Sequence, residues 1–152
     1  LLVFGQAGFL RRSVDAPLIE LRDAQGQKQV RIGHGDAAQA ASTEFYRIET
    51  FASTPLAAGV HAGGLTLLEA RIRTGRTHQI RVHARHLGLP IAGDARYGDF
   101  DANKALARAS GFKRMFLHAS RLQLAHPADG RELRLEAELP AECQRLLEAL
   151  RG

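Results

Sequence analysis

A run of basic side chains between Arg71 and His86 is the part of the sequence with the greatest potential for chemistry. It holds five arginines and three histidines, and no acidic residue occurs from Ala70 through Gly93. Like charges gathered at this density repel one another, so an anion from outside the run, or a buried one, is needed to balance them. A phosphate or a carboxylate group is the kind of anion that this run is predicted to bind.

The spacing within the run predicts a strand, a tight turn and a helix. Gly75 permits the turn, and Thr77 is a suitable N-cap for the helix. The start of that helix offers unpaired backbone N–H groups and the positive end of the helix dipole, next to Arg76. Arg81 and Arg85 lie one turn apart on the same side of the helix. The alternative is a solvated helix face whose arginines pair with acids elsewhere in the chain.

Other kinds of chemistry have weaker support. His83 and His86 have a spacing that allows two metal ligands on one helix, but the neighbouring arginines repel a cation and no cysteine or acid stands near them. We therefore predict no metal site. The pair Gly63-Gly64 precedes a strand rather than a helix, which makes it a poor phosphate-binding loop. None of these serines lies in a recognisable nucleophile motif: Ser13, Ser42, Ser53, Ser110 and Ser120.

Apolar periodicity and turn residues predict an α+β fold with a mixed, mainly antiparallel sheet and a few flanking helices. Strands are predicted over residues 1–4, 17–21, 29–32, 42–51, 65–73, 116–125 and 132–137, with hairpin turns at 23–26 and 127–130. The basic helix is predicted over 77–87, with Ile80, Ala84 and Leu87 on its buried face and Gly88 after its end. Further helices are predicted over 102–109, capped by Asp101, and after Pro140 at N1, with a buried stripe of Cys143, Leu146, Leu147 and Leu150.

Length and composition indicate one domain with a partner of opposite charge. The chain has 152 residues, 45% of them apolar, and no apolar stretch approaches the roughly 20 residues that span a bilayer. The net charge is +5, and 18 of the 21 basic residues are arginine, which favours a polyanion such as a nucleic acid, although a coding bias toward arginine gives the same composition. The single Cys143 excludes an internal disulfide and suits a cytoplasmic protein.

The first four residues, Leu1 to Phe4, read as a strand that is already under way, and the chain has no initial methionine. We therefore expect a fragment that begins inside or just before a strand. Missing strands would leave a sheet edge exposed, which favours artificial association of the fragment.

The string from Thr74 to His83 resembles the third motif of the pseudouridine synthases in the family of ribosomal large-subunit synthase A. Segments 87–98, 116–119 and 126–127 are similar to later signatures of that family, and segment 99–114 is most like large-subunit synthase C. The resemblance covers essentially the whole chain, weakly before Leu65 and strongly after it. It implies the catalytic fold of the family, incomplete at its N-terminus, with residues 1–152 as the C-terminal part of the catalytic domain.

The resemblance also implies a reaction. Such an enzyme converts specific uridines in RNA, here expected to be 23S ribosomal RNA, to pseudouridine by detaching the uracil, rotating it and rejoining it through carbon 5. It needs no cofactor or metal. A buried aspartate starts the reaction and requires a cationic partner to stay ionised. The family's arginine falls on Arg81, and the residues expected to bind substrate are Leu117 beside the uracil, Ile80, and Arg76, His78 and Arg85 at phosphates.

One departure from the family pattern limits the expected activity. The family's aspartate lies in a histidine–arginine–leucine–aspartate string, and no aspartate of this chain has that context. The chain alone is therefore expected to be inactive, as part of a longer cytoplasmic, monomeric enzyme that binds RNA and no membrane. A catalytically dead relative that acts as an RNA-binding module is the alternative, and a phosphate-binding domain unrelated to RNA is a third.

Overall fold

The structure, a computed structural model, describes residues 1–22, 24–52 and 54–152. Its largest sheet has four strands in the order β1-β6-β5-β2, formed by β1 (Leu2–Phe4), β2 (Arg11–Asp15), β5 (Ser42–Phe51) and β6 (Leu65–Ile72). Two hairpins complete the strands: β3 (Leu18–Arg22) with β4 (Lys28–Ile32), and β7 (Arg121–Ala125) with β8 (Glu132–Glu136). Every pairing between described strands is antiparallel.

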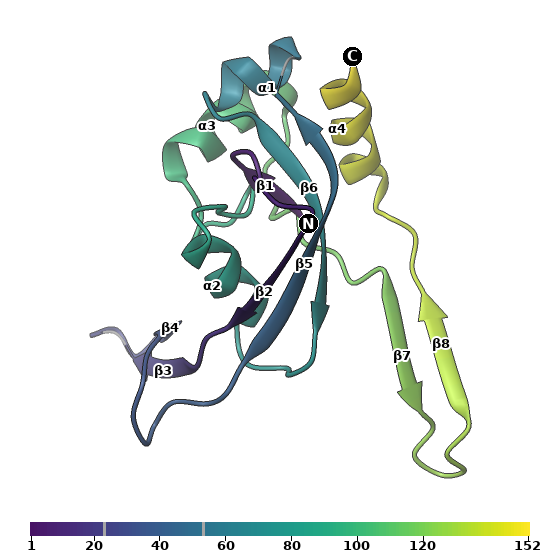
Figure 1. The fold of residues 1–152 in the computed structure, drawn as a ribbon. Helices are drawn as coiled ribbons and strands as arrows, with labels where there is room; N and C mark the ends of the chain where they lie inside the picture. The colour runs from purple at the N-terminus through teal and green to yellow at the C-terminus, as the bar shows by residue number, and fades with distance from the viewer. Residues whose placement is uncertain (23, 53) are drawn as a thin grey trace.

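Within the described residues, four helices accompany these strands: α1 (Pro55–Val60), α2 (Gln79–His86), α3 (Phe100–Ser110) and α4 (Ala141–Arg151). The three helices α1, α3 and α4 gather at one end of the main sheet, α2 lies nearer the β3–β4 hairpin, and the β7–β8 hairpin extends away from the body (Figure 1). The predicted α+β class with a mainly antiparallel sheet and flanking helices is therefore confirmed. Within the described residues no helix has the length and apolar character that crossing a bilayer requires.

Two clusters of buried side chains form on the two faces of this sheet. Leu2 and Phe4 pack with residues of α1, α3 and α4, whereas Val3, between them, packs with residues of β5, β6 and α2. Alternate side chains of a strand point to opposite faces, which is how three residues of β1 serve both clusters. The predicted buried stripe of α4 is confirmed, since Cys143, Leu146, Leu147 and Leu150 are all buried in the first cluster.

Several predicted boundaries are wrong. The strand predicted over 116–125 begins only at Arg121, and β2 and α1 were not predicted. The N-cap of α3 is Asp99, whose carboxylate accepts from two backbone N–H groups, and not Asp101. Pro140 is the N-cap of α4 rather than its first residue. Both predicted hairpins form, although Asp23 of the first turn, like Ser53, lies outside the described residues.

Candidate uridine pocket

Five of the six residues predicted for the site line one cavity of about 350 Å³. They are Arg76, His78, Ile80, Arg81 and Leu117, and the remaining lining residues are Ile72, Gln79 and Met115. The cavity thus brings the end of β6, the turn that follows it and the first half of α2 against segment 115–117. Arg85 is not among these residues; it is exposed and lines a different cavity.

The start of α2 differs from the prediction. His78, not Thr77, is the N-cap, and its backbone is left-handed, with φ of 54°. The hydroxyl of Thr77 instead bonds the carboxylate of Glu20 on β3. Thr77 therefore lies before the helix, bonded to an acid 57 residues away in the sequence. The Glu20 carboxylate already places an anion beside the start of α2. The helix start alone therefore gives no reason to expect an anion from outside the chain.

Gln79 holds the turn before α2 against the sheet, and it was missed in the sequence. Its side-chain oxygen accepts from the Arg76 N–H at 3.1 Å and from the Thr74 hydroxyl at 2.8 Å. Its side-chain nitrogen donates to the Ser42 carbonyl and to the Thr43 hydroxyl, each at 2.9 Å. With 3% of its surface exposed, Gln79 ties the turn before α2 to strand β5. A glutamine in a helix's first turn looks like an ordinary surface residue, so sequence alone gives little signal for this role.

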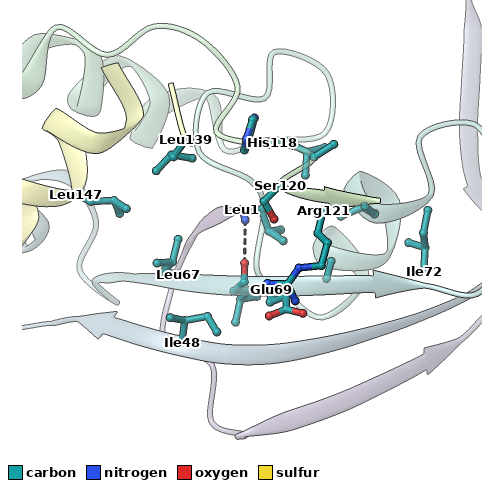
Figure 2. A pocket seen from close by; sticks show the side chains of 15 residues that line it. Leu1, Ile48, Leu67, Glu69, Ile72, His118, Ser120, Arg121, Leu139 and Leu147 are labelled. Carbon is teal, nitrogen blue, oxygen red and sulfur yellow. Dashed lines mark hydrogen bonds between the residues drawn. The ribbon is translucent and has the colours of Figure 1, made fainter. Parts of the chain in front are cut away.

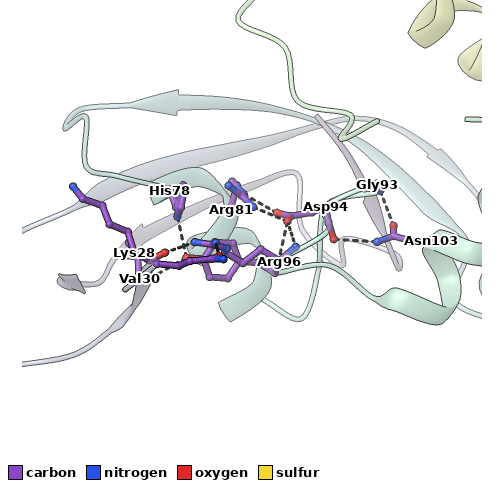
Figure 3. A network of polar contacts seen from close by, with 10 residues as sticks. Lys28, Val30, His78, Arg81, Gly93, Asp94, Arg96 and Asn103 are labelled. Carbon is purple, nitrogen blue, oxygen red and sulfur yellow. Dashed lines mark hydrogen bonds and ion pairs between the residues drawn. The ribbon is translucent and has the colours of Figure 1, made fainter. Parts of the chain in front are cut away.

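Arg81 makes a two-pronged ion pair with Asp94. Its Nε donates to Oδ2 and its Nη2 to Oδ1, both at 2.8 Å, and the guanidinium lies 4.8 Å from the ring centre of Tyr97 (Figure 3). The Arg81 side chain is 17% exposed and that of Asp94 is fully buried. Asp94 was not assigned a role from the sequence. Within the described residues, Nη1 of Arg81 donates to no protein group.

Local backbone geometry places Asp94. Oδ1 of its carboxylate also accepts from the N–H groups of Arg96 and Tyr97, at 2.8 and 3.0 Å. Burial opposes ionisation of Asp94, but the bonds from Arg81 and from these N–H groups outweigh it, so the pKa lies below its ordinary value. Gly93 precedes it with φ of +76°, in a position where a Cβ would stand 1.8 Å from a backbone oxygen. Only glycine fits such a turn.

His78 and Tyr97 connect the cavity to the β3–β4 hairpin. The Tyr97 hydroxyl accepts from the Val30 N–H at 2.9 Å and lies 2.9 Å from Nδ1 of His78. Burial first, and then the charges of Arg81 and Arg96, lower the pKa of His78, which favours the neutral ring. A neutral ring that accepts from the hydroxyl at Nδ1 carries its proton on Nε2.

Acidic side chains elsewhere in the chain neutralise much of the remaining positive charge of the basic run. Arg71 pairs with Glu69 at 2.6 Å, and Arg73 lies 3.4 Å from Glu44. With Arg81 on Asp94, the alternative of internal ion pairs holds for three of the five arginines. Arg76 is exposed and its Nε donates to a backbone carbonyl.

His83 has a structural environment. Its Nδ1 lies 2.9 Å from the Thr43 hydroxyl and its Nε2 lies 3.0 Å from the Ala16 carbonyl, so both ring nitrogens have protein partners. Nε2 of His118 similarly lies 3.1 Å from the Ala137 carbonyl.

A second, larger cavity of about 500 Å³ adjoins the first and shares Ile72, Ile80 and Leu117 with it. Its walls are mainly aliphatic and include Leu139 and Leu147, and the backbone nitrogen of Leu1 lies in it, bonded to the Leu68 carbonyl at 2.8 Å (Figure 2). The described lining of the two cavities contains a single acid, Glu69, which is paired with Arg71. Arg81 therefore faces a space with apolar walls and no aspartate of the described chain.

Comparison with known proteins gives the context for this arrangement. Ribosomal large subunit pseudouridine synthase C of Salmonella typhi is 38% identical over 152 residues, which is 99% of this chain and 44% of that protein. Human RNA pseudouridylate synthase domain containing 1 has a TM-score of 0.67 at 23% identity, covering 99% of this chain and 63% of that one. Human RNA pseudouridylate synthase domain containing 4 has a TM-score of 0.65 at 26% identity, covering 99% of this chain and 60% of that one.

No family model matches the chain. The chain spans less than half the length of the synthase C relative. Over nearly all of its residues, the chain nevertheless has the fold of RNA pseudouridylate synthase domains and a sequence similar to ribosomal large subunit pseudouridine synthase C, as its motifs predicted.

Proposed function

We propose that this chain is the C-terminal part of the catalytic domain of an RNA pseudouridine synthase and supplies the basic side of its uridine pocket. The observation that carries the proposal is the cavity in which Arg81, Ile80 and Leu117 meet. The proposed substrate is large-subunit ribosomal RNA, the molecule named for the relative of 38% identity. The proposal places the protein in the cytoplasm, as a monomer, with no cofactor or metal in the reaction.

The walls of the cavity fit the two demands of the reaction. Ile80 and Leu117 offer aliphatic surface for the flat uracil ring, and Arg81 offers a guanidinium beside them. A carboxylate that attacks the nucleoside must stay ionised where water is excluded, and a fixed cation lowers its pKa. The unused Nη1 of Arg81 is the donor that we assign to that carboxylate, while Asp94 holds the opposite edge of the guanidinium.

Asp94 is poorly suited to be the nucleophile itself. Its side chain is fully buried, and its oxygens accept from Arg81 and two backbone N–H groups. We infer that the reacting carboxylate comes from a segment outside the 152 residues. The larger cavity is the proposed route, because it shares three residues with the Arg81 cavity.

The rim of the cavity is the proposed place for phosphates. Arg76 is exposed there, and the Nε2–H of His78 remains available because Nδ1 takes the Tyr97 hydroxyl. Phosphate contacts of this kind position an RNA strand, while the pocket selects the base.

A chimera tests the proposal. In it, the 152-residue chain replaces the matching segment of the Salmonella typhi synthase, and tritium release from carbon-5-labelled uridine in large-subunit RNA is measured. We expect release by the chimera and none by the chain alone. Arg81→Ala should slow release by about 100-fold or more, as loss of a fixed charge at a reacting centre does. Arg81→Lys shows whether charge alone suffices, and the exposed Arg108→Ala on α3 is the matched control.

Two outcomes would contradict parts of the proposal. Release by the chain alone would mean that one of its own aspartates serves as the nucleophile. A folded chimera that binds RNA yet releases no tritium would favour the alternative function, a non-catalytic RNA-binding module. The absence of an aspartate from the described lining of both cavities is the observation that favours this alternative.

A further inference from the structure

A second basic site lies beside the C-terminal half of α2, apart from the uridine pocket. It is a cavity of about 420 Å³ between strand β4, the C-terminal half of α2 and the segment around Tyr97. It shares no lining residue with the Arg81 cavity. Its lining residues are Gln29, Val30, Arg31, Ile32, Val82, Arg85, His86, Arg96 and Tyr97.

Among the described residues, no acid lines this cavity or forms an ion pair with its arginines. Three arginines and one histidine line it, and no acid is among the described lining residues. Arg31, Arg85 and Arg96 form no ion pair with any described residue, unlike Arg71, Arg73 and Arg81 of the basic run. Three uncompensated guanidinium groups around one cavity repel one another, so an anion bound among them would be stabilised.

Arg96 is held in place without losing its charge. Its Nη1 donates to the Lys28 carbonyl and its Nη2 to Oε1 of Gln27 at 2.6 Å, so the hairpin fixes it through neutral oxygens (Figure 3). Arg85 and Arg31 are exposed. The C-terminal end of α2 carries about half a negative charge, which opposes an anion there, but three full positive charges outweigh it.

We propose that this cavity binds a backbone phosphate of the RNA whose uridine enters the Arg81 pocket. Tyr97 stands between the two sites: it lines the second cavity, its ring lies under the Arg81 guanidinium, and its hydroxyl contacts His78 of the first. Arginine favours phosphate because its planar fork donates two parallel hydrogen bonds. The inference rests on the proposed RNA function and adds a contact that holds the strand beside the pocket.

Binding of a fluorescein-labelled RNA stem–loop with a uridine loop tests this site. The dissociation constant of the 152-residue chain is measured by anisotropy over a range of salt concentrations. Arg31→Gln with Arg85→Gln removes two exposed charges from the cavity. Arg108→Gln with Arg145→Gln removes the same charge from exposed residues of α3 and α4, and serves as the control. Thermal unfolding verifies that each variant is folded.

We expect the cavity variant to bind about tenfold more weakly, and the slope of the log–log plot of affinity against salt to fall by about 1 for each phosphate that the variant no longer neutralises. The control should keep both values near those of the parent chain. A methylphosphonate RNA, neutral at one linkage, then locates the contact. At one position the neutral linkage should weaken binding of the parent chain but not of the cavity variant.

Three results would overturn the inference. Equal weakening by both double variants would mean that only net charge matters. Unchanged binding in the cavity variant, with tight binding by the parent chain, would remove the phosphate site but leave the proposed function intact. No RNA binding by the folded parent chain would count against the proposed function as well.

Discussion

Asp94 both positions the Arg81 side chain and neutralises its charge. The arginine lies between the apolar walls of the pocket and a carboxylate that is fully buried, so removing either charge leaves the other uncompensated. The geometry of the pair leaves Nη1 without a protein partner in the described chain. The pair therefore links folding of segment 93–98 to the presentation of the guanidinium.

Asp94→Asn should destabilise the chain measurably. The amide of asparagine has one acceptor oxygen, whereas the carboxylate now accepts two charged bonds from Arg81. We expect the free energy of unfolding to fall by about 2 to 3 kcal/mol. This is at the low end for a buried pair because Arg81 is partly exposed. Urea unfolding measures it. Asp101→Asn, which breaks the exposed pair with Lys104, is the matched control and should leave stability unchanged. Equal stability of the two variants would show that the Arg81 pair contributes little to folding.

Acid should destabilise the chain through His83. Burial lowers the pKa of this histidine below its ordinary value of 6.5, so the unfolded chain takes up a proton at a higher pH than the folded one. Stability is then unaffected well above pH 6.5 and falls as the pH drops through 6.5 toward the folded-state pKa. The lowered pKa of His78 acts in the same direction.

Thermal unfolding at pH 7.5 and pH 5.5 measures this effect, the two values being chosen to bracket about 6.5. His83→Gln should be less stable than the parent at the higher pH but lose less on acidification. A variant that keeps the full pH dependence of the parent would show that other groups cause it.

At the level of elements, the sequence predicted best where the pattern was strong and local. Strand β5 has the predicted bounds of Ser42–Phe51, and the buried stripe of α4 is as predicted. Strand β2 was missed because its burial pattern has one buried residue, Val14, among exposed ones. The six-residue helix α1 has a Thr54 cap and Pro55 but too little length for a periodic pattern.

The site was predicted only in part, because local spacing identifies residues that are close in sequence and not contacts between distant elements. The basic run and its family motif identified Arg76, His78, Ile80 and Arg81, because these four lie close together in sequence, and a second family signature added Leu117. Asp94, Glu20 and the Tyr97 hydroxyl act on that run from other elements, and nothing in local spacing specifies those contacts. Arg85 was grouped with Arg81 by helical spacing, but it lines the second cavity.

The β3–β4 hairpin should loosen when the Tyr97 hydroxyl is removed. Tyr97→Phe leaves the buried Val30 N–H without its acceptor, which costs about 1 to 2 kcal/mol. Amide exchange of residues 18–32 should accelerate, while that of β5 and β6 stays slow. Tyr46→Phe is the control, since Glu44 keeps bonds from Arg11 and Arg73 when the Tyr46 hydroxyl is absent. Uniform acceleration in Tyr97→Phe would indicate global destabilisation instead.

For the molecule as a whole, an exposed apolar stripe on the β7–β8 hairpin bears on association. Leu122 and Leu135 face each other across the β7–β8 hairpin, and each is 54% exposed. Leu124 and Leu133 form the next pair on the same face by the two-residue repeat of strands. The hairpin extends away from the rest of the chain (Figure 1), so little of the chain covers this stripe. Contiguous apolar surface of this kind promotes association in water.

We therefore expect the 152-residue chain, purified alone, to associate with itself as its concentration rises, even if the whole protein is a monomer. Leu122→Lys with Leu135→Glu places opposite charges on a facing pair, which preserves the hairpin through a cross-strand attraction while removing its apolar surface. Sedimentation velocity across a concentration series should show this variant as a monomer. Phe100→Ser removes an apolar residue that is 55% exposed on α3 and should leave association unchanged. A parent chain that sediments as a monomer throughout the series would mean that the hairpin stripe is too small to drive association.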